Sequence, residues 1–575
     1  MQKPFTPKSI IIIFSLIILA IVDTLAGVTL TVPTEFYHID DKKDLILVNR
    51  NINDIDTDGE GNISEIVLNK KYSFITPVTT LSTANSYRVR FEESTYTLYF
   101  TQLPVIQIGV KKEIMDSPSI YAGFTMSELT GAVTESAIDI ETRGAFSQTF
   151  PKKSYEIGFL TDTVTAESRD MRLLQMRTDN KWNLQAMYNE PLRIRSKVSN
   201  ELWQNIHQIY YKDKEPEAKN GIDIVYVELF INEEYKGVYA LSERVDRKQL
   251  KLKKYSNGVK GELYKGDNWG GAVTFTALPP FDNTSLLWGG FEYKHPEEET
   301  DWSRIYDFAN FVKNSPNEEF YRDYQKKFHL NNAVDYFIFL NLSRAIDNTG
   351  KNVYIAKYKT DDPYYYVPWD LDGVFGTNWQ GWDVNITNDI LSNGFYDRLM
   401  QDRSANGFRA TVNRRWAELR SSIITEEFIL TKFKKNHDYL LNNNVYEREN
   451  KAWSAFERDE AQLTYISTWL KNRLNYLDVA FGSALVTSDV VLSTTNNQTN
   501  ASFDLYPNPA SDYLIITSSA MAFELIIQDL NGKVVLKSSF SGKTNKIAIH
   551  QIKKGLYIAT VKSDKNIKTQ KLLIN

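Results

Sequence analysis

The spacing of hydrophobic and polar positions divides the chain into regions. In residues 27–104, short runs such as 45–48, 87–91 and 96–100 follow a strand-like pattern and are separated by turns. Alternation with a period of two is typical of strands with one buried face, so this region predicts a β-rich N-terminal domain. Residues 105–482 combine such runs with long stretches of helical periodicity, which predicts a central α+β domain.

The last region returns to a strand pattern. Residues 483–502 include TTNNQTNAS, a polar string without aromatic residues, and predict a linker. Residues 503–575 contain 10 Lys and no Arg against 4 Asp and 1 Glu, a net charge of +5. Within them, alternation over 525–529, the turn pair Asn531-Gly532 and an apolar return strand predict a β-hairpin in an all-β, sandwich-like domain.

An apolar run, residues 10–22, stands near the amino terminus. Lysines precede it, and the small residues Thr24 and Ala26 follow it. Its 13 residues fall short of the ~20 that span a bilayer, and this order is typical of a secretory signal peptide over residues 1–26. The sequence therefore predicts an exported protein without a stable transmembrane anchor, and an uncleaved anchor helix is the alternative.

The amino-acid composition excludes several kinds of functional site. The chain has 575 residues and no Cys, which excludes disulfides, thiolate metal sites and a Cys nucleophile. Its six His give little support to a multi-His metal site. The 67 Lys and Arg against 72 Asp and Glu leave a net charge of −5, which offers no argument for a nucleic-acid partner.

One acidic string in the N-terminal region has the spacing of a metal loop. Asp56, Asp58 and Glu60 place oxygen ligands on alternate positions before Gly61, as in the first half of an EF-hand loop. Val67 stands where the closing bidentate Glu is needed. The string is a candidate calcium site, and a solvated acidic turn is the alternative.

The central region contains a pattern suited to phosphoryl transfer. Asp347 and Asn352 stand in a D-x-x-x-x-N spacing before a predicted hairpin, and Asp370 and Asp372 follow that hairpin. In phosphoryl transfer an Asp accepts the proton of the attacking hydroxyl, while an Asn and a second Asp hold the metal that bridges the phosphates. Hard oxygen ligands of this kind suit Mg²⁺ or Mn²⁺. Helix capping and turn formation by the same residues are the structural alternative.

A strand, a loop and a second strand lie upstream, with basic residues between them. The loop contains Arg143, Gly144 and Ser147, and the returning strand follows Lys152 and Lys153. This layout covers nucleotide phosphates and pairs them with an ammonium group, although the loop has too few glycines for a Walker motif. Because alternate positions of the strand from 155 onward are apolar, we expect Lys153 to point inward and Lys152 outward. A basic hairpin edge is the alternative.

Two further residues extend this layout. Arg195 lies on a predicted helix together with Glu201, which is either the partner of the phosphate lysine or a solvated helical residue. A predicted hairpin over 225–241 ends just before Glu243, where a kinase would have the hinge segment beside the adenine. Arg195 and Glu243 are therefore candidate nucleotide-binding residues.

The order of these strings resembles the CotH family of spore-coat-like, secreted atypical kinases. The similarity covers residues 105–482 and is carried by IETRGAFSQTFPKKSYEI, KWNLQAMYNEPLRIRSK, VELFINEEYKGVYALSERVDR, SRAIDNTGKNVYIAKY, VPWDLDGVFG and YISTWLKNRLNYLDVAF. The resemblance implies a small protein-kinase-like fold. It also implies ATP-dependent phosphorylation of Ser or Thr in exported proteins, with Mg or Mn as the metal.

The resemblance implies roles for individual residues as well. Asp347 falls on the family's catalytic Asp, and Asn352 and Asp370 fall on its metal positions, with Asp372 nearby. One member of the lysine pair falls on the nucleotide lysine, and the loop that begins at Arg143 falls on the phosphate-covering loop.

Two positions depart from the family pattern. Ala145 stands where the family commonly has Asn, and Glu190 stands where it commonly has Asp. Ala145 removes a polar group near the phosphates, whereas Glu190 keeps the charge with a longer reach. Neither change removes the expected centre, but both leave the activity open.

The terminal region has a resemblance of its own. The strings YPNPASDYL, DLNGKVV, KKGLY and KLLI follow one another as in the C-terminal sorting domain of type IX secretion cargo. This resemblance implies a Bacteroidota-type cell and passage across the outer membrane by the type IX secretion machinery. It also implies removal of the domain, with surface attachment or release. An ordinary β-sandwich binding module is the alternative.

Two other functions compete with an exported kinase, because ATP is scarce outside cells. A cell-surface binding or adhesion protein on a kinase-like scaffold would use an aromatic platform made of residues 364–366, Trp369, Trp379 and Trp382. Burial of these aromatic residues in the core is the favoured alternative, because alternating strands bury one face. A metal hydrolase would use Asp370, Asp372 and Asp383, although this segment has no group of His residues to support it.

Overall fold

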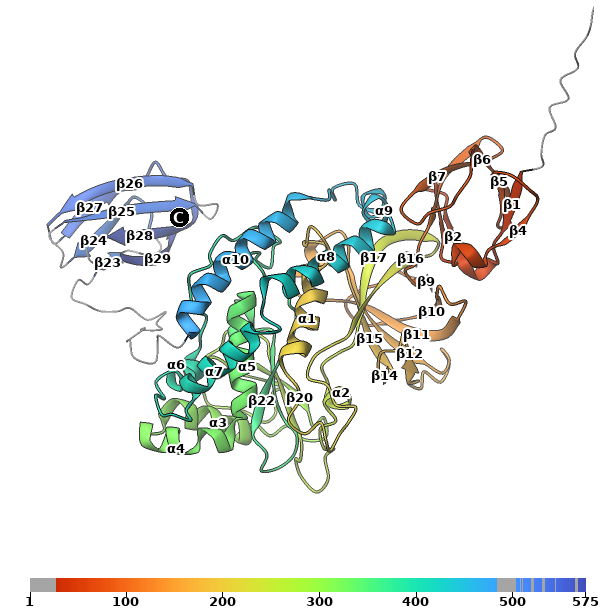
Figure 1. Ribbon diagram of the computed structural model, residues 1–575. Helices are drawn as coiled ribbons and strands as arrows, with labels where there is room; N and C mark the ends of the chain where they lie inside the picture. Colours follow the sequence, from red (N-terminus) through yellow and green to blue (C-terminus); the bar gives the residue numbers. More distant parts are fainter. Residues whose placement is uncertain are drawn as a thin grey trace, which may run out of the picture.

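The computed structural model describes residues 27–482 and, with short gaps, residues 503–575. The predicted signal peptide and the predicted linker lie outside the described residues. The protein has a mixed α+β architecture, with β-rich sheets at the N-terminal end, a helical region in the middle and antiparallel sheets at the C-terminal end (Figure 1). None of the helices in the described part of the chain combines the length and hydrophobicity that a bilayer crossing requires.

An eight-stranded sheet forms the N-terminal part of the fold. Its spatial order is β2-β3-β8-β7-β6-β5-β1-β4. The strands are β1 (Val28–Thr31), β2 (Tyr37–Asp40), β3 (Leu45–Val48), β4 (Asp56–Asp58), β5 (Ile63–Val67), β6 (Lys71–Val78), β7 (Ser86–Phe91) and β8 (Ser94–Phe100). The β-rich prediction is confirmed, and buried and exposed residues alternate along β7. The predicted alternation is wrong for β3 and for the end of β8, where both faces are buried.

The next strands close into a barrel with the order β10-β11-β12-β15-β17-β16-β9. They are β9 (Val105–Val110), β10 (Ile120–Ser127), β11 (Val133–Arg143), β12 (Ser154–Leu160), β15 (Lys181–Gln185), β16 (Ile224–Ile231) and β17 (Glu234–Ser242). Two short strands, β13 (Met171–Arg172) and β14 (Thr178–Asp179), pair within the loop between β12 and β15. Apolar side chains such as Ile157 and Leu241 form one buried cluster inside the barrel, which leaves its ends and outer face for polar chemistry.

A five-stranded sheet and the helices complete the central region. The sheet has the order β19-β20-β18-β21-β22, with β18 (Glu262–Gly266), β19 (Leu287–Trp288), β20 (Phe291–His295), β21 (Val353–Lys357) and β22 (Tyr364–Pro368). The helices are α1 (Arg195–Ile206), α2 (Arg247–Leu250), α3 (Ser303–Asn314), α4 (Asn317–Lys327), α5 (Leu330–Ser343), α6 (Gly394–Leu399), α7 (Phe408–Arg420), α8 (Glu426–Asn442), α9 (Val445–Ala452) and α10 (Ala461–Phe481). Helix α5 is packed against α1, α7, α10 and β22, which explains why its sequence is apolar nearly all round.

Most of the aromatic platform considered from the sequence belongs to this core. Residues 364–366 of β22 are at most 2% exposed, and Trp369 is 7% exposed. One face of β22 packs on α5, and the tyrosine on the opposite face packs on Tyr211. These four residues therefore belong to the core, as the alternative interpretation expected, whereas Trp379 and Trp382 are 39% and 52% exposed.

The C-terminal part consists of two antiparallel sheets. The first has the order β23-β24-β27 and the second β26-β25-β28-β29, with β23 (Phe503–Tyr506), β24 (Tyr513–Ser518), β25 (Ala522–Asp529), β26 (Val534–Ser541), β27 (Thr544–Ala548), β28 (Gly555–Lys562) and β29 (Ile567–Ile574). Strands β25 and β26 pair as the hairpin that the sequence predicted. Leu514 and Ile516 of the first sheet share one buried cluster with Leu525 and Val561 of the second.

Candidate active site

The acidic residues singled out from the sequence lie where α5 leads into the β21–β22 hairpin. The 3-10 turn η4 (Asp347–Thr349) follows α5 closely. In the hairpin Val353 pairs with Pro368, so Asn352 lies beside the segment that leads to Asp370. The short hairpin therefore brings the D-x-x-x-x-N segment and the later Asp residues to the same end of the sheet, as the spacing predicts.

A buried amide that the sequence analysis did not single out joins these segments. Asn348 donates from Nδ2 to the carbonyl oxygens of Asn352 at 2.6 Å and Trp369 at 2.8 Å. Its own carbonyl accepts a hydrogen bond from the Tyr336 hydroxyl of α5 at 2.8 Å. Asn352 and Asp370 have φ angles of +55° and +52°, in the left-handed region that few residues adopt. Backbone of this kind persists where surrounding contacts fix it, and it is concentrated at functional sites.

Burial and mutual repulsion disfavour the charged form of two Asp side chains here. Burial raises the pKa of Asp347, Lys351 opposes that rise, and Asp370 adds to it. Burial, followed by repulsion from Asp370, raises the pKa of Asp372 well above its usual value. A divalent cation would offset this repulsion, and the oxygen chemistry fits Mg²⁺ or Mn²⁺. Within the described residues, however, no three Asp, Glu or His side chains are arranged closely enough to hold a metal ion.

The lysine pair is oriented opposite to the sequence prediction. Lys152 is 1% exposed, and its ammonium donates to Glu449 Oε1 at 2.5 Å and to the Val238 carbonyl at 2.6 Å. Lys153 turns back and donates to two carbonyls of its own loop, at 2.6 and 2.7 Å. The predicted alternation does not extend to the lysines because β12 begins only at Ser154, and the apolar face of that strand fills the barrel interior.

The partner of the buried lysine comes from a distant helix. Glu449 of α9 lies 297 positions from Lys152 and also accepts hydrogen bonds from Arg193 at 3.2 Å. Burial lowers the pKa of Lys152 to about 8, and the negative charge of Glu449 opposes this shift. Glu201, which the sequence offered as one choice of partner, instead pairs with Lys197 on its own helix at 2.9 Å. No local sequence signal could have identified Glu449.

One pocket is lined by residues of the loop, by the buried lysine and by two of the acidic residues. Its lining includes Arg143, Gly144, Ser147, Lys152, Asp370 and Asp372. The loop contains the 3-10 turn η3 (Phe146–Thr149), and the ring of Phe146 meets that of Trp379 with centroids 4.5 Å apart. The pocket thus joins a loop of the barrel to the acidic segment of the helical region.

Arg195 is not among the residues that line this pocket. Its buried guanidinium donates to Glu190 Oε1 at 2.7 Å and to Gln462 Oε1 at 2.8 Å. Glu190 does line the pocket, and its carboxylate also accepts hydrogen bonds from backbone N–H groups at the start of α1. Arg195 therefore contacts the pocket lining through Glu190.

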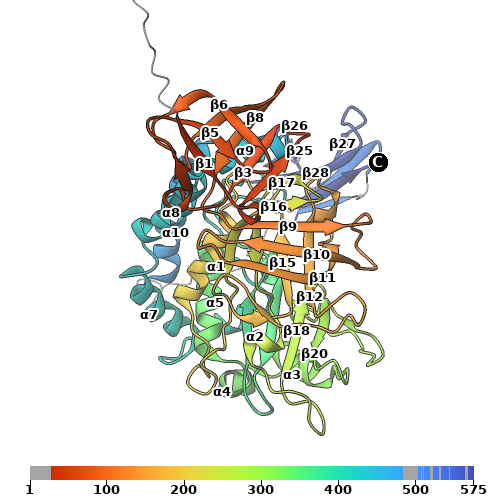
Figure 2. The ribbon, with the colours of Figure 1, turned by 90° about the vertical axis from the view of Figure 1, so that its right-hand side faces the viewer.

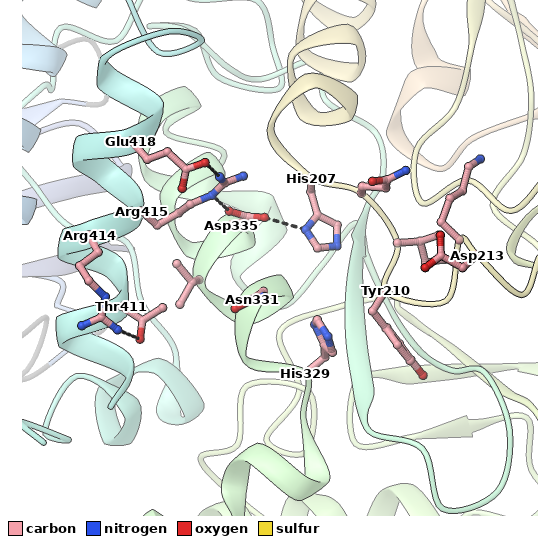
Figure 3. Close-up of a pocket in the computed structure, with 14 residues that line it drawn as sticks. His207, Tyr210, Asp213, His329, Asn331, Asp335, Thr411, Arg414, Arg415 and Glu418 are labelled. Atoms are coloured by element: carbon pink, nitrogen blue, oxygen red, sulfur yellow. Dashed lines mark hydrogen bonds and ion pairs between the residues drawn. The ribbon is translucent and has the colours of Figure 1, made fainter. Parts of the chain in front are cut away.

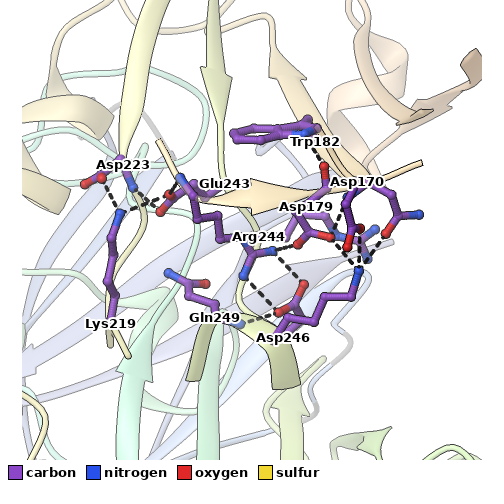
Figure 4. A network of polar contacts seen from close by, with 12 residues as sticks. Asp170, Asp179, Trp182, Lys219, Asp223, Glu243, Arg244, Asp246 and Gln249 are labelled. Carbon is purple, nitrogen blue, oxygen red and sulfur yellow. Dashed lines mark hydrogen bonds and ion pairs between the residues drawn. The ribbon is translucent and has the colours of Figure 1, made fainter. Parts of the chain in front are cut away.

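Glu243 also lies outside the pocket lining and belongs to a separate network of polar contacts (Figure 4). Its carboxylate accepts hydrogen bonds from Lys219 Nζ at 3.0 Å and from the backbone N–H groups of Arg177 at 2.9 Å and Asp223 at 3.0 Å. Arg177 in turn donates to Asp246 at 2.7 Å. These contacts fix the chain where it leaves β17, which is a structural role.

The acidic string of the N-terminal region lies between strands. Asp56 and Asp58 belong to β4, which pairs with β1, and β5 follows them. All three carboxylates of the string, including Glu60, are exposed. An EF-hand loop is flanked by two α-helices, whereas here the 3-10 turn η2 (Ile52–Asp54) precedes the string and strand β5 follows it.

A second pocket, of about 610 Å³, lies among the end of α1, the start of α5 and α7 (Figure 3). Its Asp335 accepts a hydrogen bond from Arg415 Nε at 2.7 Å and contacts His207 Nδ1 at 2.7 Å. His207 Nε2 lies 3.2 Å from the amide nitrogen of Asn332. The side chains of His207, Asp335 and Arg415 are hydrogen-bond partners of one another, which indicates a structural cluster.

The fold and the site define a mixed α+β protein with a basic loop, a buried lysine and an acidic segment near one pocket. Comparisons with known proteins identify the family of this chain. Residues 140–477 match the family model of the CotH kinase protein, and residues 504–575 match that of the secretion system C-terminal sorting domain. The chain is also 22% identical over 389 residues to inner spore coat protein H of Bacillus subtilis (strain 168), covering 66% of this chain and 97% of that protein. Because the first match spans more than half of the sequence, the chain belongs to the CotH kinase family.

Proposed function

We propose that the protein is an exported, ATP-dependent kinase that phosphorylates Ser or Thr residues of other exported proteins. The observation that carries this proposal is the pocket in which the loop of Arg143, the buried Lys152 and the pair Asp370 and Asp372 meet. Membership of the CotH kinase family supports the reaction type. In this proposal the barrel and the helical region are the two lobes of a small protein-kinase-like fold.

Each residue is assigned the role that its surroundings suit. Asp347 accepts the proton of the acceptor hydroxyl, and ATP supplies the phosphoryl group when bound. Asn352 and Asp370, with Asp372 beside them, would hold Mg²⁺ or Mn²⁺. Lys152 contacts the phosphates, while the loop of the barrel covers them.

Titration with ATP tests the nucleotide site. We expect the mature chain to bind ATP in the presence of Mg²⁺ or Mn²⁺, and we expect Asp370→Ala to lose this binding because the metal bridge is removed. Isothermal calorimetry with and without metal measures both, and circular dichroism checks that the variant is folded. A folded parent that does not bind ATP with either metal would favour the binding or adhesion function on a kinase-like scaffold.

The sorting domain indicates export, and we propose that the type IX secretion machinery carries the chain to the cell surface or beyond. Deleting residues 503–575 should therefore leave the protein inside the outer membrane of a cell with this machinery. Cell fractionation and surface proteolysis measure its position, with an intact chain as the control. Surface delivery of the shortened chain would contradict this assignment.

A further inference from the structure

Helix α9 connects three parts of the protein through three consecutive residues. Glu449 binds the buried Lys152, and it also accepts the backbone N–H of Val238 at 2.9 Å. Arg448 forms an ion pair with Glu228 of the barrel, and both side chains are fully buried. Glu447 accepts a hydrogen bond from the Tyr99 hydroxyl of the N-terminal sheet at 2.7 Å. The same two turns of helix therefore contact the pocket, the barrel and the N-terminal sheet.

The N-terminal sheet also holds the junction between α8 and α9. The backbone N–H of Gln102, just after β8, donates to Asn443 Oδ1 at 2.7 Å, and Asn443 is 1% exposed. Thr83 Oγ1 donates to the carbonyl of Asn442, the last residue of α8, at 2.8 Å. The ring of Tyr99 lies under the Arg448 guanidinium, 5.3 Å from its centroid. Both views of the fold show the N-terminal sheet beside α9 (Figure 1 and Figure 2).

An apolar cluster joins the same parts. Leu45, Leu47 and Tyr99 of the N-terminal sheet are buried together with Phe230 and other residues of the barrel. Ala452, the last residue of α9, packs against this cluster. The polar contacts at the start of α9 and the apolar contact at its end fix the helix from both sides.

Helix α9 depends on such outside contacts because it is short. It has 8 residues, and its N-cap residue, Asn444, has φ +52° and makes no side-chain capping bond. Helices of this length are not stable by themselves in water, so contacts with the rest of the protein must hold them in place. The position of Glu449 is thus set by whatever holds α9.

We propose that the N-terminal β-rich domain is a positioning module for the nucleotide site. Through Tyr99 and Asn443 it fixes α9, and α9 holds Glu449 against Lys152. Tyr99, Glu447 and Asn443 are positioning residues that act through Glu449, since none of them lines the pocket. This inference rests on the proposed nucleotide site. Its first step, that the N-terminal domain fixes α9, does not depend on nucleotide binding.

Two mild substitutions test the inference in the full chain. Tyr99→Phe removes one hydroxyl and keeps the ring, and Asn443→Ala removes the acceptor of the Gln102 N–H. Because a typical hydrogen bond changes an equilibrium by about three- to tenfold, we expect each variant to raise the KM for ATP about threefold and the pair about tenfold, with kcat nearly unchanged. Glu447→Gln keeps one acceptor oxygen for the Tyr99 hydroxyl, so it should raise the KM for ATP less than Tyr99→Phe does.

Strand β8 supplies a matched control. Tyr96 also donates its hydroxyl to a carboxylate, that of Asp41 at 2.9 Å, but this contact stays within the N-terminal sheet. Tyr96→Phe should therefore leave the KM for ATP at the parental value. If the lost hydrogen bond affected only the stability of the fold, both Tyr variants would be less stable. The KM for ATP would then not differ between Tyr99→Phe and Tyr96→Phe.

Hydrogen exchange separates this inference from the proposed function. The amides of α9 should exchange about tenfold faster in the Tyr99→Phe, Asn443→Ala pair than in Tyr96→Phe. If the pair loosens α9 and weakens ATP binding, the inference holds. Unchanged exchange, or faster exchange without a change in KM, overturns it. A parent that binds no ATP refutes the proposed function, and the inference then survives only as a statement about α9, if its exchange still rises.

Discussion

Replacing Asp347 with Asn should remove nearly all phosphoryl transfer and leave ATP binding intact. Asn has almost the same shape but cannot take up the proton of the acceptor hydroxyl, and loss of a positioned base typically lowers the rate by about 10²- to 10⁴-fold. Asp347 is not among the residues that line the pocket with Lys152, so the Kd for ATP should stay within about twofold of the parent. Radiolabel transfer to an exported protein, beside calorimetric titration, measures the two effects separately.

The stability of this variant distinguishes a catalytic role from helix capping. Turn η4 has Ile346 at its N-cap position and no side-chain capping bond, so capping by Asp347 finds no support. Burial raises the pKa of Asp347, so its folded-state pKa lies above the unfolded value and the carboxylate destabilises the fold once the pH exceeds both. Asp347→Asn should therefore melt at the parental temperature or slightly higher at pH 7, which differential scanning calorimetry checks.

Asp361→Asn is the matched control for this prediction. Asp361 lies in the turn between β21 and β22, is exposed, and has φ +68°, which Asn tolerates. It carries the same chemical change, in the same hairpin, away from the pocket. Parental transfer rates in both variants would show that Asp347 is not the base, whereas equal losses in both would point to damage of the hairpin.

The acidic half of the site could be predicted from the sequence because that half is local. Asp347, Asn352 and Asp370 are joined by one short hairpin, and the register of Val353 with Pro368 follows from its length. Spacing alone therefore predicts that these side chains lie at the same end of the hairpin. The β-rich N-terminal region and the C-terminal hairpin could be predicted for the same reason, because strand and turn patterns depend only on near neighbours in the sequence.

The basic half could not be located in this way. Which lysine is buried depends on where β12 begins, and the turn η3 before it breaks the alternation on which the prediction for Lys153 depended. Glu449 is remote from Lys152 in sequence, and only the packing of α9 against β17 brings them together. The burial of residues 364–366 likewise depends on distant elements that cover both faces of β22, which periodicity cannot reveal.

Replacing Lys152 with Met should weaken ATP binding about 10- to 100-fold, the usual range for a lost hydrogen bond to a charged group. Met fills a similar volume without the ammonium, and Glu449 keeps Arg193 as a partner, so the variant should still fold. Lys153→Met is the matched control, because Lys153 donates only to carbonyls of its own loop and should lose little affinity. If Lys153→Met lost more affinity than Lys152→Met, the phosphate contact would have to be reassigned to Lys153.

The pH dependence gives this prediction a second signature. Burial lowers the pKa of Lys152 to about 8 from its usual 10.5, so the ammonium is present below pH 8 and is lost as the pH rises through that value. ATP affinity of the parent should therefore fall between pH 7 and 9, while that of Lys152→Met should stay level. Stability should change in the opposite direction: between pH 8 and 10.5 the unfolded chain binds more protons at this residue than the folded chain, so the free energy of unfolding rises with pH. Denaturant titrations of parent and variant across this range measure the difference. A parent that loses both affinity and stability together above pH 8 would show that another group controls the site.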